Sequence, residues 1–377
     1  MEMKNLKKAA ERIQKAIEKG EKIILYTDAD LDGVTSVVIL KETIKNLGAK
    51  ICAIYFPDRE KDGYGLNKAG IEFLKRFSPA LLITLDLGIG NFEEVKMAKE
   101  LGFEIIIVDH HEILDKVPEA DIVVDPKQEG DKYPFKDLAT VGISFKLAEI
   151  LLGEKMSREL RKSFLELVAL GTIADLMPQC NENEIFIQEG LHFIQNSFRP
   201  GIKAFFEMEM FENLDLNQKI FKLTSLLNVR ENEKSIPISF KLFTSSSTDE
   251  AKRLIENLFF KKEERKKKVK EILEGIEKRI RAEKLIFEGD KEWDFSVLGN
   301  VASLLCKKFR KPTFIFKKLE KESIGAVRAP SGINSVDLME KCRTYLLTFG
   351  GHPPASGFRI KNENLENFKN CLNENLK

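Results

Sequence analysis

The feature that most constrains the fold is a regular alternation of short apolar runs and helix-like stretches over the first 125 residues. The apolar runs, several of them rich in isoleucine and valine, cover residues 23–26, 51–56, 81–86, 104–109 and 122–125. Helix-like stretches lie between most of them, at 36–47, 68–77 and 92–101. Strands that alternate with helices at this spacing predict an α/β fold with a parallel sheet and crossover helices.

Acidic residues and histidines follow directly after three of these runs. Asp28, Asp30 and Asp32 follow the first run, Asp86 ends the third, and Asp109 with its neighbours His110 and His111 follows the fourth. In parallel sheets of this kind, ligands bind outside the carboxyl ends of the strands. The chain has only four histidines, and two of them are adjacent here. The sequence therefore places its candidate site at this edge of the sheet.

The spacing of Asp28, Asp30 and Asp32 puts them on one face of an extended segment. Converging carboxylates repel one another, and a divalent cation would neutralise them. Alternatively, they form an exposed acidic turn closed by Gly33, or cap a helix that begins near Val34. Taken alone, the three aspartates favour one of these alternatives.

Combined with Asp86, His110 and Asp175, the same aspartates favour a metal site. Carboxylate and imidazole ligands suit Mn²⁺, Mg²⁺, Fe²⁺ or Zn²⁺. Five or so ligands exceed one tetrahedral site, so the residues indicate two metals. Two metals can activate water for hydrolysis of a phosphoester.

The rest of the chain predicts a helical connector and a smaller α/β domain. Residues 186–260 look helical, and residues 261–284 carry 11 Lys and Arg against 6 Asp and Glu, a local +5 in a chain of net charge +1. Any electrostatic binding of nucleic acid would therefore be confined to a local basic region of the chain. The apolar side chains of this stretch, Val269, Ile272, Leu273, Ile276 and Ile280, share one helix face. Beyond residue 286, strand-like segments at 313–316 and 324–327 alternate with helix-like ones at 301–309 and 335–347.

The composition also bears on compartment. The five cysteines are scattered and odd in number, so the sequence predicts neither a disulfide framework nor a cysteine-type zinc site. No apolar run is long enough to span a bilayer, and the first twenty residues are charged throughout. We therefore expect a cytoplasmic protein that does not enter a membrane.

Four motifs, in order, resemble those of the DHH phosphoesterase superfamily, and within it the core of the RecJ single-strand exonucleases. They are residues 26–33 (YTDADLDG), 86–91 (DLGIGN), 109–111 (DHH) and 171–175 (GTIAD). Segments typical of RecJ lie between them, at 56–59, 62–66 and 133–142. Residues 299–303, 324–328 and 349–358 are similar to the DHH-associated domain. The resemblance implies a DHH domain at 1–195, a helical connector at 196–285 and a DHH-associated substrate-binding domain at 286–377.

The resemblance also implies roles for individual residues. Asp30 and Asp32 would each bind one of two divalent cations, Mn²⁺ or alternatively Mg²⁺, Asp86 would bridge them, and His110 and Asp175 would complete the better-filled site. Asp109 would orient the histidines and His111 would contact the scissile phosphate. Asp28 and Asn91 would lie behind the ligands. In the second domain, the residues implied to hold a nucleotide phosphate are Arg328, Gly350, Gly351 and His352.

One position departs from the family pattern, because Tyr26 stands where many members have histidine. We expect the metal held by Asp30 and Asp86 to be the weaker one. The leading functional hypothesis is a metal-dependent exonuclease that hydrolyses single-stranded DNA or RNA to nucleotides. The alternatives are a phosphodiesterase or phosphatase for short oligonucleotides, cyclic dinucleotides or nucleotide phosphates, and a non-catalytic replication or repair scaffold. The sequence is silent on protein partners.

Overall fold

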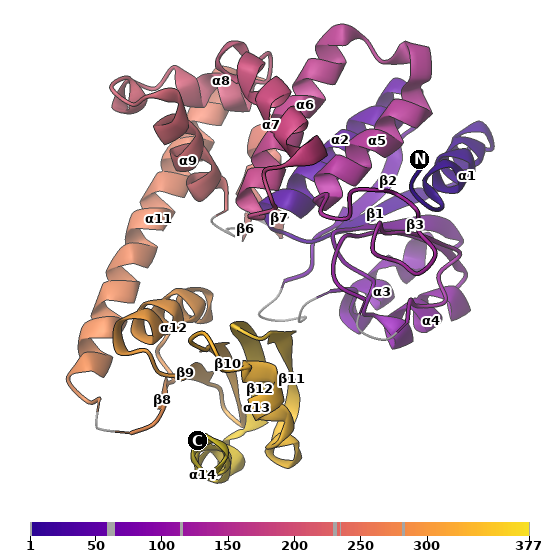
Figure 1. Ribbon diagram of the computed structural model, residues 1–377. Helices are drawn as coiled ribbons and strands as arrows, with labels where there is room; N and C mark the ends of the chain where they lie inside the picture. The colour runs from indigo at the N-terminus through magenta and orange to yellow at the C-terminus, as the bar shows by residue number, and fades with distance from the viewer. Residues whose placement is uncertain are drawn as a thin grey trace. The chain divides into compact units, whose positions relative to one another are not determined.

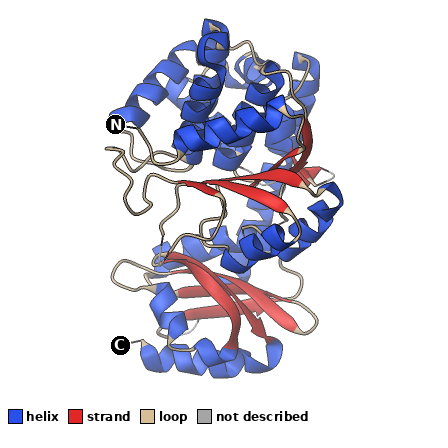
Figure 2. Ribbon diagram, turned by 90° about the vertical axis from the view of Figure 1, so that its right-hand side faces the viewer, coloured by secondary structure: helices blue, strands red, loops and turns tan. Residues whose placement is uncertain are grey.

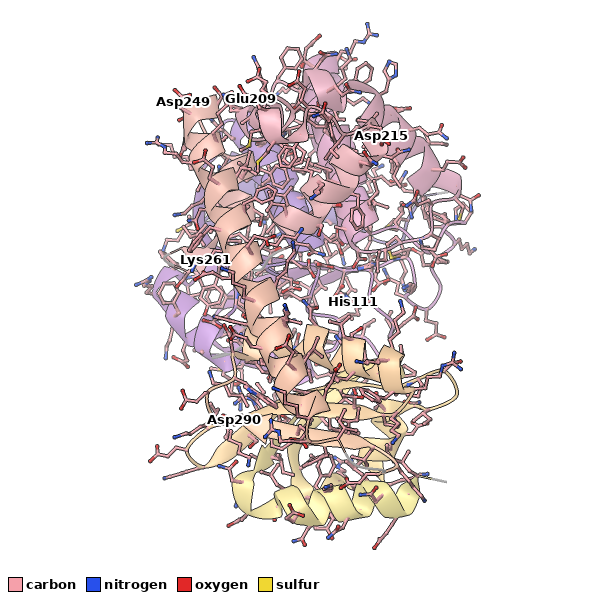
Figure 3. The ribbon with its side chains drawn as sticks, turned by 90° about the vertical axis from the view of Figure 1, so that its left-hand side faces the viewer. His111, Glu209, Asp215, Asp249, Lys261 and Asp290 are labelled. Atoms are coloured by element: carbon pink, nitrogen blue, oxygen red, sulfur yellow. A yellow bond between two sulfur atoms is a disulfide. The ribbon has the colours of Figure 1, made fainter. Side chains whose placement is uncertain are left out.

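The computed structural model describes residues 2–58, 65–113, 116–228, 232–233, 235–280 and 283–376. Arg59, Asp62 and Tyr64 of the RecJ-like segments lie outside this range. The chain divides into two compact units, Met1–Phe260 and Lys261–Lys377. The boundary falls within one long helix, α11 (Thr248–Glu277), on which Lys261 lies partway along (Figure 3). The three-part division expected from the sequence stays a prediction.

Unit 1 is built on a five-stranded parallel sheet, as the alternation of runs predicts, and its strand order is β2-β1-β3-β4-β5. Its strands are β1 (Ile23–Thr27), β2 (Ile51–Tyr55), β3 (Ala80–Leu85), β4 (Phe103–Val108) and β5 (Ile122–Val124). All the residues of β1 and β3 are buried, which suits central strands covered on both faces. The order reverses between β1 and β3, and this is where such sheets form ligand crevices.

Helices cover both faces of this sheet (Figure 1). One apolar core joins the sheet to α1 (Leu6–Glu18), α2 (Leu31–Asn46), α5 (Thr140–Leu152) and α6 (Arg158–Ala174). A smaller core on the other face contains α3 (Lys68–Leu74) and α4 (Phe92–Glu100). The remaining elements of unit 1 are α7 (Asn181–Phe193), α8 (Pro200–Phe206), α9 (Leu216–Leu227), α10 (Ile238–Phe243) and the short strands β6 (Asn232–Glu233) and β7 (Ile236–Pro237).

Two contacts fix α2 against α6. Gly171 of α6 lies so close to α2 that an added Cβ would be 2.5 Å from Thr35 Oγ1. At the far end of α2, the buried Arg199 donates two hydrogen bonds to the Glu42 carboxylate, at 2.8 and 2.7 Å, and one to the Ser163 carbonyl of α6 at 3.4 Å. Ser197, two residues before Arg199, donates to Glu166 of α6 at 2.6 Å. The helix pair is therefore held at both ends.

Unit 2 contains a mixed five-stranded sheet in the order β11-β12-β10-β9-β8. Its strands are β8 (Ile286–Asp290), β9 (Thr313–Lys318), β10 (Glu322–Arg328), β11 (Leu346–His352) and β12 (Ala355–Lys361). One face packs on α13 (Ser335–Glu340) and α14 (Leu365–Asn375). The other face packs on α12 (Phe295–Phe309) and the apolar stripe of α11, in which Val269, Ile272 and Ile276 are buried. The stripe expected from the sequence is confirmed for these residues and for the partly buried Leu273, whereas Ile280 lies beyond the end of α11 at Glu277. Figure 2 shows the strands of this sheet in red, with the C-terminal helix against one face.

Two expectations for unit 2 were wrong. The helix predicted at 335–347 ends at Glu340, and Leu346 begins strand β11, because the pairing of β11 with β12 overrides a local helical pattern. The structure also contains a disulfide between Cys342 and Cys371, with Cα atoms 6.0 Å apart. Five cysteines can still form a bridge, and spacing along the chain does not indicate that α14 returns to the end of α13. Among the described residues, no helix is both long and apolar enough to cross a bilayer.

Candidate metal centre

The carboxyl ends of β1, β3 and β4 bring the predicted site residues together. Asp28 follows β1, Asp86 follows β3, and Asp109 with both histidines follows β4. Two further aspartates, Asp30 and Asp32, lie at the start of α2, and Asp175 lies at the end of α6. Asp86 has a φ of 61°, a left-handed conformation that aspartate tolerates better than most residues.

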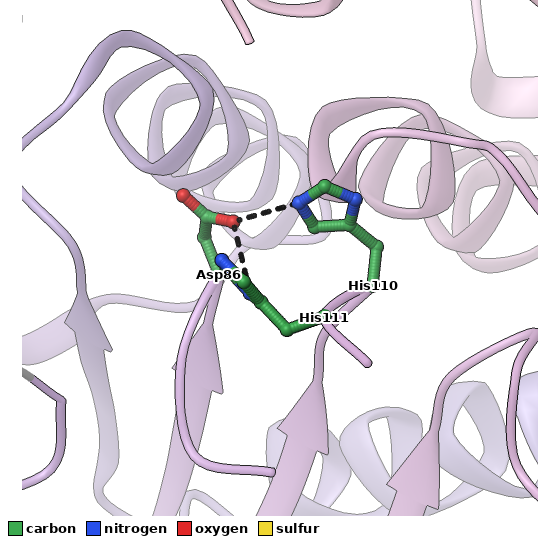
Figure 4. A group of neighbouring side chains, drawn as sticks. All are labelled: Asp86, His110 and His111. Atoms are coloured by element: carbon green, nitrogen blue, oxygen red, sulfur yellow. Dashed lines mark ion pairs between the residues drawn. The ribbon is translucent and has the colours of Figure 1, made fainter. Parts of the chain in front are cut away.

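His110 lies at the centre of one group of ligand atoms. Its Nε2 atom is 3.3 Å from Asp175 Oδ2, 3.5 Å from Asp86 Oδ1 and 3.8 Å from Asp32 Oδ2. Figure 4 shows His110 and His111 both directed toward the carboxylate of Asp86. Oxygens of Asp32 and Asp175 with a nitrogen of His110 lie within 4.8 Å of one another, a span that one cation can bridge.

A second group consists of Asp28, Asp30 and Asp86, again with ligand atoms within 4.8 Å of one another. Asp86 approaches His110 and also belongs to this second group, as expected for a bridging ligand. Asp28 lies closer to the ligand atoms than the sequence suggests, which makes it a candidate ligand rather than a residue behind them. The alternate positions of Asp28 and Asp30 in the sequence were the pattern from which a ligand role for Asp28 could have been predicted.

The carboxylates also have structural partners. Asp30 caps α2 by accepting from the Gly33 N–H at 3.2 Å, as the capping alternative anticipated. The two oxygens of Asp32 accept from the Thr140 and Val141 N–H groups at 2.8 Å each, which fixes the start of α5. The Thr140 hydroxyl donates to Asp86 at 3.2 Å. The sequence did not indicate Thr140, because its contacts to these aspartates are tertiary.

Asp109 holds the histidine pair in place. One of its oxygens accepts from the backbone N–H groups of His110 and His111 and lies 2.7 Å from His111 Nδ1. Its other oxygen accepts from the Ile89 N–H at 3.1 Å. Burial would raise the pKa of Asp109, but the hydrogen bond and charge of His111 lower it below its usual value. Burial would lower the pKa of His111, and its hydrogen bond and charge interaction with Asp109 raise it to about 9.

The electrostatics of the cluster fit a bound cation. Burial, reinforced by the charges of neighbouring aspartates, raises the pKa values of Asp32 and Asp86 well above the usual range. Burial lowers the pKa of His110 to about 3, which keeps the imidazole neutral and able to act as a ligand. Among the described residues, neither ring nitrogen of His110 has a hydrogen-bond partner. Divalent cations would neutralise these carboxylates and provide the imidazole with a partner.

Tyr26 and Asn91 lie to one side of the cluster. The ring of Tyr26 is buried in the smaller core beside Tyr55, and its hydroxyl donates to the Gly65 carbonyl at 3.3 Å. Asn91 accepts from the Leu66 N–H at 3.0 Å. Both side chains therefore hold the segment at residues 65 and 66, and neither belongs to the ligand groups found among the described residues.

In unit 2, Arg328 lies beside a cavity of about 870 Å³. The lining also includes Lys307 and Arg310, so three cationic side chains face the same space, and Ser303 and Ser331 add hydroxyl groups. Gly350 and Gly351 lie on β11 opposite Gly357 and Ser356. A Cβ on Gly351 would be 2.7 Å from the Ala355 carbonyl oxygen, so glycine is needed there. His352 ends β11.

Divalent cations are expected to stabilise the folded protein. Adding Mn²⁺ at about 100 times its Kd should raise the free energy of unfolding by about 2.7 kcal/mol, because the cation binds the assembled cluster and not the unfolded chain. The measurement is calorimetry with Mn²⁺ and with EDTA. The matched variant Asp86→Asn should lose most of the increase. Identical midpoints of the parent protein in Mn²⁺ and in EDTA would contradict the proposed centre.

Comparison with known protein families supports the assignment of these residues to a DHH-type metal centre. The model described as "DHH family, N-terminal domain" matches residues 22–172, and the one described as "DHHA1 domain" matches residues 264–377. Fold and site together thus define a DHH-type protein with a DHHA1 domain.

Similar proteins of known name show to which family of DHH proteins the chain belongs. The single-stranded-DNA-specific exonuclease RecJ of Salmonella typhimurium is 30% identical over 406 residues, which cover 99% of this chain and 69% of that protein. RecJ of Bacillus subtilis is 37% identical over 381 residues, and the chain spans 48% of its length. The chain belongs to the RecJ family of DHH proteins.

Solved structures agree with this assignment. A crystal structure of exonuclease RecJ bound to manganese matches with a TM-score of 0.84 and 26% identity, covering 99% of this chain and 94% of that one. RecJ of Thermus thermophilus in complex with Mn²⁺ matches with a TM-score of 0.83 and 25% identity, covering 99% of this chain and 55% of that one.

Proposed function

We propose that this protein is a Mn²⁺-dependent exonuclease that hydrolyses single-stranded DNA to nucleotides. The observation that carries the proposal is the convergence of Asp32, Asp86 and Asp175 on His110 at the sheet edge. The relatives named single-stranded-DNA-specific exonuclease and the manganese-bound RecJ structures support the substrate and the metal. A cytoplasmic location agrees with a DNA substrate and stays a prediction, as do RNA as a substrate and any protein partner.

The chain's own residues have distinct tasks in this reaction. Asp32, His110 and Asp175 would hold one cation, Asp30 and Asp28 the other, and Asp86 both. When bound, the two cations supply activation of water and neutralisation of charge at phosphorus. His111, whose pKa is raised by its hydrogen bond to Asp109 and by the charge of Asp109, would contact a phosphate oxygen as charge develops there. In unit 2, Arg328 would bind a phosphate group, since its planar fork matches phosphate oxygens.

Nucleotide release is the direct test. With Mn²⁺, single-stranded DNA labelled at either end should be degraded to mononucleotides, while the same sequence as a blunt duplex should be degraded much more slowly. The label that is released first gives the polarity. Absence of release by a protein that is folded and binds Mn²⁺ would contradict the proposal and favour a scaffold.

Substrate length separates the proposal from its closest alternative. Rates should not fall as single strands are lengthened from two to thirty nucleotides if the enzyme processes long strands. A steep preference for di- to tetranucleotides, or turnover of cyclic dinucleotides only, would instead assign the short-substrate function. RNA strands of the same lengths serve as the comparison for sugar preference.

A further inference from the structure

The end of α6 has an unusual residue beside the metal centre. The helix ends at Ala174, Asp175 follows, and Leu176 has a φ of 58°. The Leu176 N–H donates to the Ile173 carbonyl at 3.2 Å, and the Met177 N–H donates to the Thr172 carbonyl at 3.3 Å. These two bonds are those of a Schellman cap, whose left-handed position is usually occupied by glycine. A leucine there is conformationally costly, because its Cβ crowds the backbone.

The Leu176 side chain does not pack in the apolar core of unit 1. It is 89% exposed, the largest value among the exposed large hydrophobic side chains of the described residues. Its neighbours Ile173, Ala174 and Met177 pack against the main core of unit 1, whereas Leu176 does not. The apolar contact that usually accompanies a Schellman cap is made by the residue after the left-handed one, here Met177. The cap therefore does not need the side chain of Leu176, which is left in solvent.

The position of Leu176 suggests what it contacts. The Cα atom of Leu176 is about 3.8 Å from that of Asp175, as for any two consecutive residues. The Oδ2 atom of Asp175 in turn lies 3.3 Å from His110 Nε2. A phosphodiester that reaches this centre brings its attached nucleosides with it. Every base has an apolar face, and proteins that bind single strands without sequence preference stack aromatic side chains on such faces. An exposed aliphatic side chain offers an apolar surface to the same face.

We propose that Leu176 packs against the nucleobase next to the scissile phosphate and so positions single strands for cleavage. This inference rests on the proposed function. Leu176 is a positioning residue that acts on the base, while the aspartates and histidines act at the phosphate. An aliphatic side chain accepts any base, so the contact is independent of sequence. A base within a duplex is stacked and paired, so the contact also favours unpaired ends.

The test compares Leu176→Gly with the parent protein on two substrates. One is a single strand, and the other is the same strand with abasic sites at the terminal nucleotides. On the intact strand, the variant should raise KM about fivefold, which corresponds to the low end of the range for aromatic side chains that stack on bases. On the abasic strand, parent and variant should have equal KM, because the base that Leu176 contacts is missing.

Stability and a matched control separate this role from a structural one. The variant should melt at the same or a higher temperature, since glycine adopts a φ of 58° without strain. Ile150→Ala removes another exposed aliphatic side chain, at the far end of α5 from the site, and should leave KM unchanged. An equal KM for parent and Leu176→Gly on the intact strand, or a lower melting temperature, would overturn the inference. Lack of release by the parent protein would instead contradict the proposed function.

Discussion

Replacement of Asp86 by alanine or asparagine is expected to lower Mn²⁺-dependent nucleotide release by at least about 10³-fold, because a bridging ligand is lost and two cations together contribute several kcal/mol of charge stabilisation at phosphorus. Asp86 belongs to the group with Asp28 and Asp30 and lies 3.5 Å from His110 of the other group, so its removal is expected to affect both cations. The measurement is the initial rate of nucleotide release from a labelled single strand at saturating Mn²⁺.

The fold should survive the asparagine substitution. Without cations, burial and the neighbouring carboxylates already raise the pKa of Asp86 well above its usual range, so a neutral side chain relieves repulsion. Asparagine also tolerates the φ of 61° at this position. The matched control is Asp121→Ala, which removes an exposed aspartate that pairs with Lys99 at the other end of β4. Equal losses of activity in the two variants would contradict the role of Asp86.

Replacement of Arg199 by alanine is expected to destabilise the protein by about 3 kcal/mol, the low end for breaking a buried ion pair. The Arg199 side chain is 7% exposed and that of Glu42 is 25% exposed, so the substitution leaves a largely buried carboxylate without its guanidinium. It also removes a positive charge near Glu166, whose pKa burial already raises to about 7. Urea denaturation followed by circular dichroism measures the loss.

A surface arginine provides the comparison. Arg161 is 42% exposed and pairs with Glu149 and Glu189 on the surface of α5, α6 and α7. Exposed pairs contribute about 0–1 kcal/mol, so Arg161→Ala should shift the unfolding midpoint only slightly. If both arginine variants unfold at the same urea concentration, the bridge between α2 and α6 does not stabilise the fold as argued.

The sheet of unit 1 could be predicted because its strands are buried on both faces. Strands such as Ile23–Thr27 and Ala80–Leu85 are continuous apolar runs, and the residues after each run meet at one edge in any parallel sheet. This topological rule, rather than any local signal, brings Asp86 and His110 to within 3.5 Å of each other. Asp86 and His110 were therefore predictable from strand ends, whereas Asp175 follows helix α6. The resemblance to DHH proteins added the roles.

Other features could not be predicted, because they depend on contacts between distant segments. The disulfide pairs cysteines 29 residues apart, and only the packing of α13 and α14 brings them together. The partner of Arg199 is 157 residues away in the sequence. Strand β11 begins in a stretch with a helical pattern, and its partner β12 decides its conformation. The left-handed Leu176 follows a helix whose sequence gives no glycine signal for a cap.

The hydrogen bonds of Asp32 affect how mutants of this centre should be interpreted. One carboxylate anchors the first turn of α5 through Thr140 and Val141 while it also faces the histidine. An inactive Asp32 variant would combine a lost cation with a loosened helix start, so its phenotype would not report on catalysis alone. Asp86 accepts a single side-chain hydrogen bond, from Thr140, among the bonds described. A substitution of Asp86 therefore reports on the reaction more directly than a substitution of Asp32 does.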